Sequence, residues 1–249
     1  LAVMIKMAET VVGGRDGLRE RPFLIHYSEP TPPLLHSQGA VSKLFLCAEE
    51  RIPVNYTPAT LMGASGPVTL AGGIVQANAE ALSGLVLHQI KAKGAPIISG
   101  FAAPPIDMRA STPGYCAPEF RLTHSACADL YHYYGVPTWG TAGAAESHCL
   151  DPQAGAEWGL SLFTAAMDGC NLIHDVGYMG QGLVGSPAAI VICDELIAFV
   201  KRMRRGFDIN RETLALDAIR SVELGGTYLA SDHTVKHYRN ELWQPRLLN

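Results

Sequence analysis

The chain has few charged residues and lacks the signature motifs of several enzyme classes. Asp, Glu, Lys and Arg make up 17% of its 249 residues, and the formal net charge of -4 offers no basic surface for DNA or RNA. No GxSxG nucleophile elbow is present, and no GxGxxG follows the first predicted strand, which disfavours a hydrolase and an open dinucleotide-binding sheet. His148 and Cys149 are adjacent, without a third ligand at a recognised spacing, so we predict that the chain binds no metal.

The sequence also lacks paired cysteines and long apolar runs. None of its six cysteines forms a CxxC pair and most lie in apolar surroundings, which predicts reduced, buried thiols in a cytoplasmic protein. No apolar run reaches about 18 residues without a polar break, so we expect no membrane span. The beginning of the sequence has no signal-peptide pattern.

What the sequence does have is a repeated strand, loop and helix pattern, with 48% apolar residues, 25 Gly and 16 Pro. The predicted strands lie at 22–27, 53–57, 95–99, 136–140 and 171–175. The predicted helices that follow them lie at 39–51, 67–93, 118–134, 154–168 and 187–204. Short strands that are apolar through their middle are typical of a parallel sheet buried on both faces. Repeated units of this kind predict an α/β fold of the TIM (β/α)8 type, incomplete here, with about five C-terminal units.

We expect one domain over residues 1–249, the C-terminal portion of such a barrel. Residues 208–249 follow the fifth unit with an amphipathic helix at 211–223 and an aromatic tail, so we expect a helical extension packed on the barrel. The chain begins inside a helical pattern at 1–10 without an initiator Met. Five strands cannot close a (β/α)8 barrel, so we expect about three more strands before Leu1 in a longer protein.

Catalytic groups in such barrels lie at the carboxyl ends of the strands and in the loops that follow. His174 and Asp175 end the fifth predicted strand, and because alternate strand residues point to opposite faces, we expect one of them to face the barrel mouth. The alternative is a buried histidine that ties the strand to a helix. Glu29 lies among prolines on a rigid loop, where it either holds a cation or caps a turn. Gln76 shares a helix face with Glu80 and is a further candidate.

Aromatic residues recur near the same ends of the predicted strands: Tyr27, Tyr56, Tyr115, Trp139 and Tyr178. Each one alone is explained by core packing. Together they favour binding of a tertiary or quaternary ammonium group, because an aromatic face attracts such a cation by about 0.5 to 2 kcal/mol.

Several segments resemble the trimethylamine:corrinoid methyltransferase family. They are SEPTPPLLH at 28–36, PVTLAGGIVQANAEA at 67–81, DMR at 107–109, PTWGTAG at 137–143, DPQAG at 151–155, LIHDVGY at 172–178, HTVKHYR at 233–239 and WQPR at 243–246. They occur in one order along essentially the whole chain. The resemblance therefore covers the sequence as a C-terminal half of a longer protein.

The resemblance implies a TIM-type barrel that moves a methyl group from a small methylated amine to the Co(I) corrinoid, or cobalamin, of a partner protein. Archaeal members use pyrrolysine in the loop after the fourth strand, and the matching position here is Ala144. The chain thus resembles the non-pyrrolysine branch, whose donors include quaternary amines such as glycine betaine. We also expect a homo-oligomer.

On this hypothesis, the predicted site divides into two groups. The catalytic residues are His174, Asp175 and Glu29. The substrate-binding residues are Tyr27, Tyr56, Gln76, Arg109, Trp139 and Tyr178, with Arg109 or His174 holding a substrate carboxylate if one is present.

Two other functions stay open at this point. A barrel lyase or aldolase would place a lysine at a strand end to form a Schiff base, and none of the five predicted strands has one. A barrel that binds a methylamine or a corrinoid without turnover is compatible with every residue named above.

Overall fold

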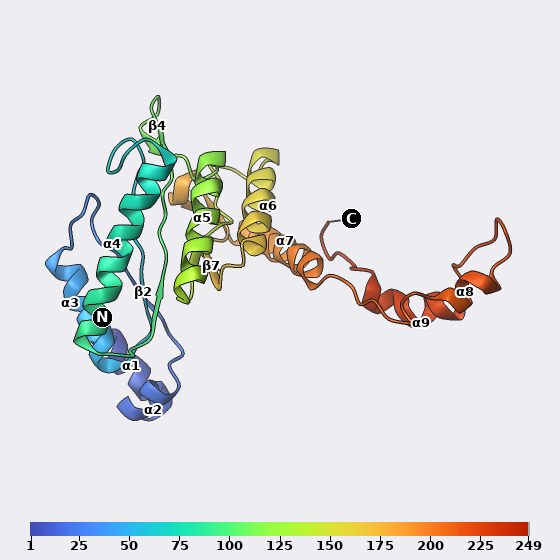
Figure 1. Ribbon diagram of the computed structural model, residues 1–249, viewed down its shortest axis with the longest axis horizontal. Helices are drawn as coiled ribbons and strands as arrows, with labels where there is room; N and C mark the ends of the chain where they lie inside the picture. Colours follow the sequence, from blue (N-terminus) through green and yellow to red (C-terminus); the bar gives the residue numbers. More distant parts are fainter. Residues whose placement is uncertain (249) are drawn as a thin grey trace.

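The computed structural model describes residues 1–248, which form alternating helices and short strands followed by an extended C-terminal arm (Figure 1). The helices are α1 Ala2–Val12, α2 Arg15–Glu20, α3 Gln38–Glu50, α4 Leu70–Lys91, α5 Pro118–Tyr134, α6 Pro152–Met167, α7 Pro187–Arg205, α8 Leu216–Ser221 and α9 Asp232–Glu241. The parallel strands are β1 His26–Ser28, β2 Val54–Tyr56, β3 Ile97–Ser99, β6 Trp139–Thr141 and β7 Leu172–His174. Two small hairpins are formed by β4 Ile106–Asp107 with β5 Thr112–Pro113, and by β8 Tyr178–Met179 with β9 Val184–Gly185, the second enclosing the short 3-10 helix η1 Gly180–Gly182.

The helices begin where the sequence supplies partners for their free N–H groups. Asp151 accepts a hydrogen bond from the Ala154 N–H at the start of α6, and Ser37 does the same for Ala40 in α3. Proline opens α5, α6 and α7, where its missing N–H costs nothing because that position has no intrahelical acceptor. These signals place the helix starts close to the predicted ones.

The five parallel strands follow one another in space in chain order. β1, β2 and β3 form one paired set, and β6 pairs with β7. A single bridge between Ser99 and Thr138 joins the two sets, with the Ser99 N–H donating to the Pro137 carbonyl at 3.1 Å. Consecutive helices from α3 to α7 pack side by side, and α3, α4 and α5 also contact the strands. The predicted alternation of parallel strands and helices is therefore confirmed, although only three residues of each strand are paired.

Helix α4 is the one helix within residues 1–248 that is long and apolar enough, by length and composition alone, to cross a membrane. It contacts α3, α5, β2 and β3, and its buried residues include Glu80 and His88. Ala77 and Ala81 join Met62, Phe101 and Tyr131 in one apolar cluster. These contacts make α4 a crossover helix of the α/β body.

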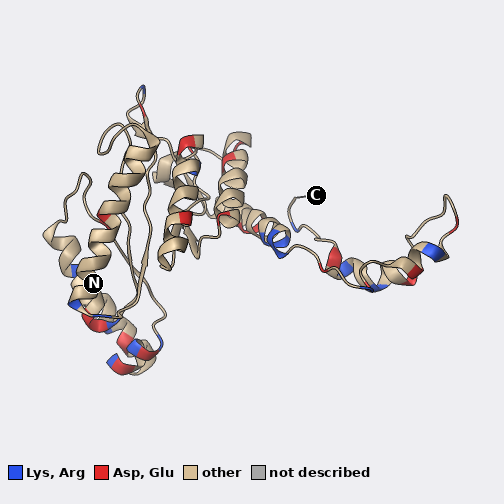
Figure 2. Ribbon diagram, in the orientation of Figure 1, with Lys and Arg blue, Asp and Glu red and all other residues tan. Residues whose placement is uncertain are grey.

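The C-terminal arm, residues 207–248, leaves the body after α7 (Figure 1). No residue of α8 or α9 is buried, and acidic and basic side chains are interspersed along the arm (Figure 2). The arm returns to α7 at Trp243, whose ring meets Phe199 edge-on at 5.3 Å, and at Arg246, which pairs with Asp194 at 2.8 Å. Both of these contacts join the predicted extension to the body through α7.

Three local elements differ from the sequence-based expectation. The predicted helix at 211–223 is helical only over Leu216–Ser221, whereas the predicted aromatic tail at 237–243 overlaps the second half of α9. The long loops after β3 and β7 each contain a hairpin. A two-residue strand is too short to produce the alternating pattern by which strands are predicted from sequence.

Burial of His88 on α4 predicts a loss of stability in acid. The side chain is fully buried, the Gln89 amide donates to its Nδ1 at 3.0 Å, and burial lowers the pKa of His88 to about 4. An unfolded histidine has a pKa of about 6.5, so between these values the proton binds only the unfolded chain. The stability is therefore present above about pH 6.5 and is lost as the pH falls towards 4.

We expect His88→Met to remove this component, which amounts to about 3 kcal/mol of unfolding free energy between pH 6.5 and pH 4. Urea unfolding of the full-length protein at several pH values measures it. His132→Gln, which removes an exposed histidine from α5, is the matched control and should keep the wild-type slope. Equal pH slopes for His88→Met and wild type would contradict the assignment.

Candidate functional site

A cavity of about 470 Å³ lies at the carboxyl ends of the parallel strands. Strands β1, β6, β7 and β8 contribute lining residues, and so do the loops after β1, β2, β3, β5 and β7. The lining residues are Tyr27, Glu29, Thr57, Ala59, Ala102, Tyr115, Trp139, Thr141, His174, Asp175 and Tyr178. This is the end at which barrel enzymes carry their reacting groups. Six of the residues predicted for the site therefore meet in one place: Tyr27, Glu29, Trp139, His174, Asp175 and Tyr178.

Three rings pack together in this cavity. The Trp139 and His174 ring centroids are 4.8 Å apart, and Tyr27 lies 6.0 Å from Trp139 and 6.1 Å from His174. All three pairs are tilted, with interplanar angles of 41° to 48°. Tyr115 and Tyr178 also line the cavity, which is consistent with an aromatic surface for a cation.

Both ring nitrogens of His174 have hydrogen-bond partners. Nδ1 lies 2.7 Å from Asp175 Oδ1, and Nε2 lies 3.1 Å from the Thr141 hydroxyl. We expected strand alternation to send only one of His174 and Asp175 to the mouth, but both line the cavity. The reason is that Asp175 has a left-handed backbone (φ 72°), which ends the strand and turns its carboxylate back towards His174.

Two carboxylates give the cavity a negative field. Glu29 is exposed at the mouth and accepts a hydrogen bond from the Tyr27 hydroxyl at 2.9 Å. Burial, together with Glu29 and Asp175, raises the pKa of Tyr27, and the same influences raise the pKa of Tyr115. No Lys or Arg from residues 1–248 lines the cavity. An arrangement of aromatic faces and carboxylates without a basic residue favours a small cation.

Tyr56 does not join this cavity, because the strand register places it on the other face of the sheet. Tyr27 pairs with Asn55, so the neighbouring Tyr56 points the opposite way. Its buried ring fills the space left by Gly84 of α4, where an added Cβ would come within 2.1 Å of the ring. Its hydroxyl lies 2.7 Å from His36 Nδ1. Tyr56 therefore packs against α4 and does not line the cavity.

Gln76 and Arg109 also lie outside the cavity. The Gln76 amide donates to the Ser65 carbonyl at 2.7 Å and to Glu80 at 3.0 Å, so it fastens the loop after β2 to α4. Arg109 is exposed in the hairpin between β4 and β5, where its backbone N–H donates to Asp107. Neither residue lines the cavity.

Ala144, the position matched to pyrrolysine, is buried in the loop after β6. It forms a parallel bridge with Tyr178, and its carbonyl accepts a weak hydrogen bond from the Cys116 thiol at 3.4 Å. Ala144 therefore lies beside a residue that lines the cavity. Thr141 was not predicted, although its position at the end of β6 is the signal that identifies it.

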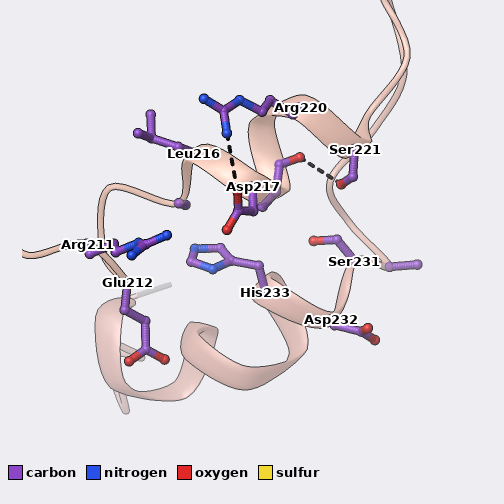
Figure 3. Close-up of a pocket in the computed structure, with 12 residues that line it drawn as sticks. Arg211, Glu212, Leu216, Asp217, Arg220, Ser221, Ser231, Asp232 and His233 are labelled. Atoms are coloured by element: carbon purple, nitrogen blue, oxygen red, sulfur yellow. Dashed lines mark hydrogen bonds and ion pairs between the residues drawn. The ribbon is translucent and has the colours of Figure 1, made fainter.

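A larger hollow, of about 780 Å³, lies in the arm between α8 and α9 (Figure 3). The ring of His233 points into it, with Arg211, Asp217 and Arg220 around it, and Asp217 pairs with Arg220 at 3.4 Å. None of its lining residues comes from a strand end. Acidic and basic side chains are mixed, and none of the lining side chains has a buried polar atom that lacks a hydrogen-bond partner. The strand-end cavity is thus the better candidate for chemistry.

Comparison with known proteins identifies the family. Residues 2–249 match the family described as trimethylamine methyltransferase (MTTB). The chain belongs to this family. The segments that resembled it in the sequence contribute Glu29, Trp139, Thr141, His174, Asp175 and Tyr178 to the cavity.

Several curated relatives of this MTTB-family chain are known. It is 35% identical to trimethylamine methyltransferase MttB of Desulfitobacterium hafniense (strain DSM 10664 / DCB-2), over 96% of this chain and 48% of that protein. It is 30% identical to glycine betaine methyltransferase of Desulfitobacterium hafniense (strain Y51), over 98% and 51%. It is 32% identical to trimethylamine methyltransferase MttB of Methanosarcina barkeri (strain Fusaro / DSM 804), over 89% and 45%. The chain spans about half the length of the curated relatives it matches.

The aromatic cavity predicts measurable binding of tetramethylammonium by the full-length protein. Trp139→Leu removes one aromatic face and should weaken this binding by about 2- to 30-fold, because one cation–π contact contributes about 0.5 to 2 kcal/mol. Isothermal titration calorimetry measures the change. Tyr133→Leu, at a highly exposed aromatic residue of α5 outside the cavity, is the control, and equal affinities for both variants would count against the aromatic cavity as the binding site.

Proposed function

We propose that the full-length protein moves a methyl group from a methylated amine, preferentially a quaternary one such as glycine betaine, to the Co(I) corrinoid of a partner protein. The observation that carries this proposal is the cavity at the strand ends, which joins aromatic faces to two carboxylates in a chain of the MTTB family. The relatives are named for trimethylamine and for glycine betaine, so the amine donor class agrees with both.

The chemistry of transfer explains why a cationic site is useful. The Co(I) acceptor supplies the electron pair of the new bond to the methyl carbon. The pair of the broken C–N bond stays on nitrogen, so a quaternary ammonium leaves as a neutral tertiary amine and no proton is needed. Trimethylamine as a free base has no such charge and requires activation. The protein's part is then to hold the ammonium group and aim one methyl group at the acceptor.

The residues of this chain divide that work. Tyr27, Trp139 and Tyr115 present the aromatic surface against which a trimethylated nitrogen packs. Glu29 and Asp175 supply negative charge beside it, and this charge favours the cation in the bound ground state. Both ring nitrogens of His174 already have partners, Asp175 and Thr141, and no Lys or Arg from residues 1–248 lines the cavity, so a betaine carboxylate needs a partner from elsewhere in the protein.

The curvature of the strands supports a barrel that is completed by further strands. β1 and β7 are the outer strands of the five, and a flat sheet would hold them about 19 Å apart. The rings of Tyr27 on β1 and His174 on β7 are nevertheless 6.1 Å apart. The strands therefore curl around the cavity as a barrel wall does. We propose that about three more strands close the wall and that the corrinoid protein docks over its mouth.

The test is methyl transfer by the full-length protein with reduced cobalamin and a panel of amines, followed by the absorbance change on methylation of the corrinoid. We expect transfer from glycine betaine or another quaternary amine but not from trimethylamine. The double substitution His174→Ala with Asp175→Ala should lower the rate by about 100-fold or more if these groups act in the transition state. Circular dichroism checks that the variant is folded.

Other outcomes point elsewhere. Binding of amines without transfer, with the partner protein present, would identify a non-catalytic member of the family. Transfer from trimethylamine alone would reject the quaternary donor. A folded double variant with near-normal turnover would remove His174 and Asp175 from the reaction.

A further inference from the structure

Thr141, at the end of β6, is held by a side-chain network from α5 that lies behind the cavity. Its backbone N–H donates to His124 Nε2 at 3.1 Å, and its carbonyl accepts from the Arg121 guanidinium at 2.9 Å. Its hydroxyl lies 3.1 Å from His174 Nε2. Thr141 is thus connected on one side to the body and on the other side to the cavity.

The reason that side chains hold this backbone is local to the sheet. β6 pairs with β7 along its length, with Thr141 opposite His174. Within residues 1–248, β3 meets β6 only at the Ser99–Thr138 bridge, so it supplies no ladder partner for Thr141. An unpaired buried N–H or carbonyl costs about 1 to 3 kcal/mol. Arg121 and His124 take the place of the missing strand neighbour.

The hydrogen bonds define the state of His124. Because Nε2 accepts from an N–H, its proton must lie on Nδ1, which is 3.2 Å from Asp168 Oδ2. Ser125 donates to the other carboxylate oxygen of Asp168 at 2.9 Å. His124 is 4% exposed and Arg121 is 9% exposed, and burial lowers the pKa of His124 although Asp168 is close. His124 is therefore a buried neutral imidazole of one tautomer.

Gly140 makes this approach possible. A Cβ at position 140 would lie 2.7 Å from His124 Nε2 and 2.8 Å from the Cys170 sulfur. Any larger residue would push His124 away from the backbone that it binds.

We propose that Arg121 and His124 are positioning residues for the cavity: they fix Thr141, and Thr141 fixes the tautomer and the orientation of His174. The Asp175 carboxylate can only accept, so the His174 proton lies on Nδ1, and Nε2 accepts from the Thr141 hydroxyl. Two Asp–His pairs are thereby joined through one threonine. His174 then presents one donor nitrogen to Asp175 and one acceptor nitrogen to Thr141. This inference rests on the proposed function only for its catalytic consequence.

The first test is Thr141→Val in the full-length protein. Valine keeps the shape and the two backbone hydrogen bonds but removes the hydroxyl. ¹⁵N spectra of histidine-labelled protein, with His174 assigned by its own Gln variant, report the tautomer. We expect wild-type His174 to carry its proton on Nδ1, and Thr141→Val to shift the Nε2 resonance towards that of a free acceptor. Thr141→Ser should restore the wild-type signal.

The second test is His124→Leu, with His124→Gln as the conservative variant, because the Gln amide oxygen reaches the position of Nε2. We expect His124→Leu to alter the same His174 signals and to weaken tetramethylammonium binding and methyl transfer by about 10-fold or more, as loss of an outer-shell hydrogen bond does at metal sites. His124→Gln should recover most of both. His132→Gln on the same helix is the control and should leave all readouts unchanged.

An unchanged His174 spectrum in Thr141→Val overturns the proposal, and so does an unchanged spectrum in a folded His124→Leu. If His124→Leu does not fold, the valine variant decides alone. The spectra require no methyl transfer. A wild-type protein with the expected His174 signals but no transfer activity would therefore count against the proposed function and not against the positioning network.

Discussion

Parallel main-chain pairing decides which side chains meet in this chain, because the register of each pair sets both the point where a strand ends and the face on which its residues lie. Tyr27 pairs with Asn55, and Thr141 pairs with His174. The first pairing turns Tyr56 away from the cavity and the second brings the threonine hydroxyl to the imidazole. A shift of one residue in either register would move these side chains to the opposite face of the sheet, and the site would not form.

Buried polar side chains on the helices then fix the loops and strand ends that surround the cavity. On α4, Glu80 accepts hydrogen bonds from the Leu34 N–H, the Thr60 hydroxyl and the Gln76 amide, at 2.7 to 3.0 Å. It thereby ties the loops after β1 and β2 to one helix. On α5, Arg121 does the same for the end of β6. A carboxylate that is 2% exposed is tolerated because its hydrogen bonds replace water. The mouth is therefore held from behind, by residues that the substrate does not touch.

The sequence allowed the order of the strands and helices to be predicted, together with the strand-end residues Tyr27, Trp139, His174 and Tyr178. Position along a strand was enough for these. It was not enough for Tyr56, which differs from Tyr27 only in register, and register depends on tertiary pairing. Asp175 could not be placed by alternation because its left-handed backbone breaks the alternation. The supporting role of Arg121 and His124 on α5 could not be predicted either, because it depends on β3 meeting β6 at one bridge only. Local patterns thus locate the site, and tertiary contacts decide its membership.

The electrostatics of the cavity limit what it can hold. Glu29 and Asp175 face the same space without a Lys or Arg from residues 1–248, and their field contributes to the raised pKa of both Tyr27 and Tyr115. Burial is the largest cause of these raised pKa values, and the negative charge of the two carboxylates adds to it. The same negative charge attracts a cation placed beside the rings. Burial alone would raise these pKa values, but it would equally repel a charged ligand. Because two carboxylates and no Lys or Arg from residues 1–248 line the cavity, it is better suited to an ammonium group than to a neutral amine or an anion.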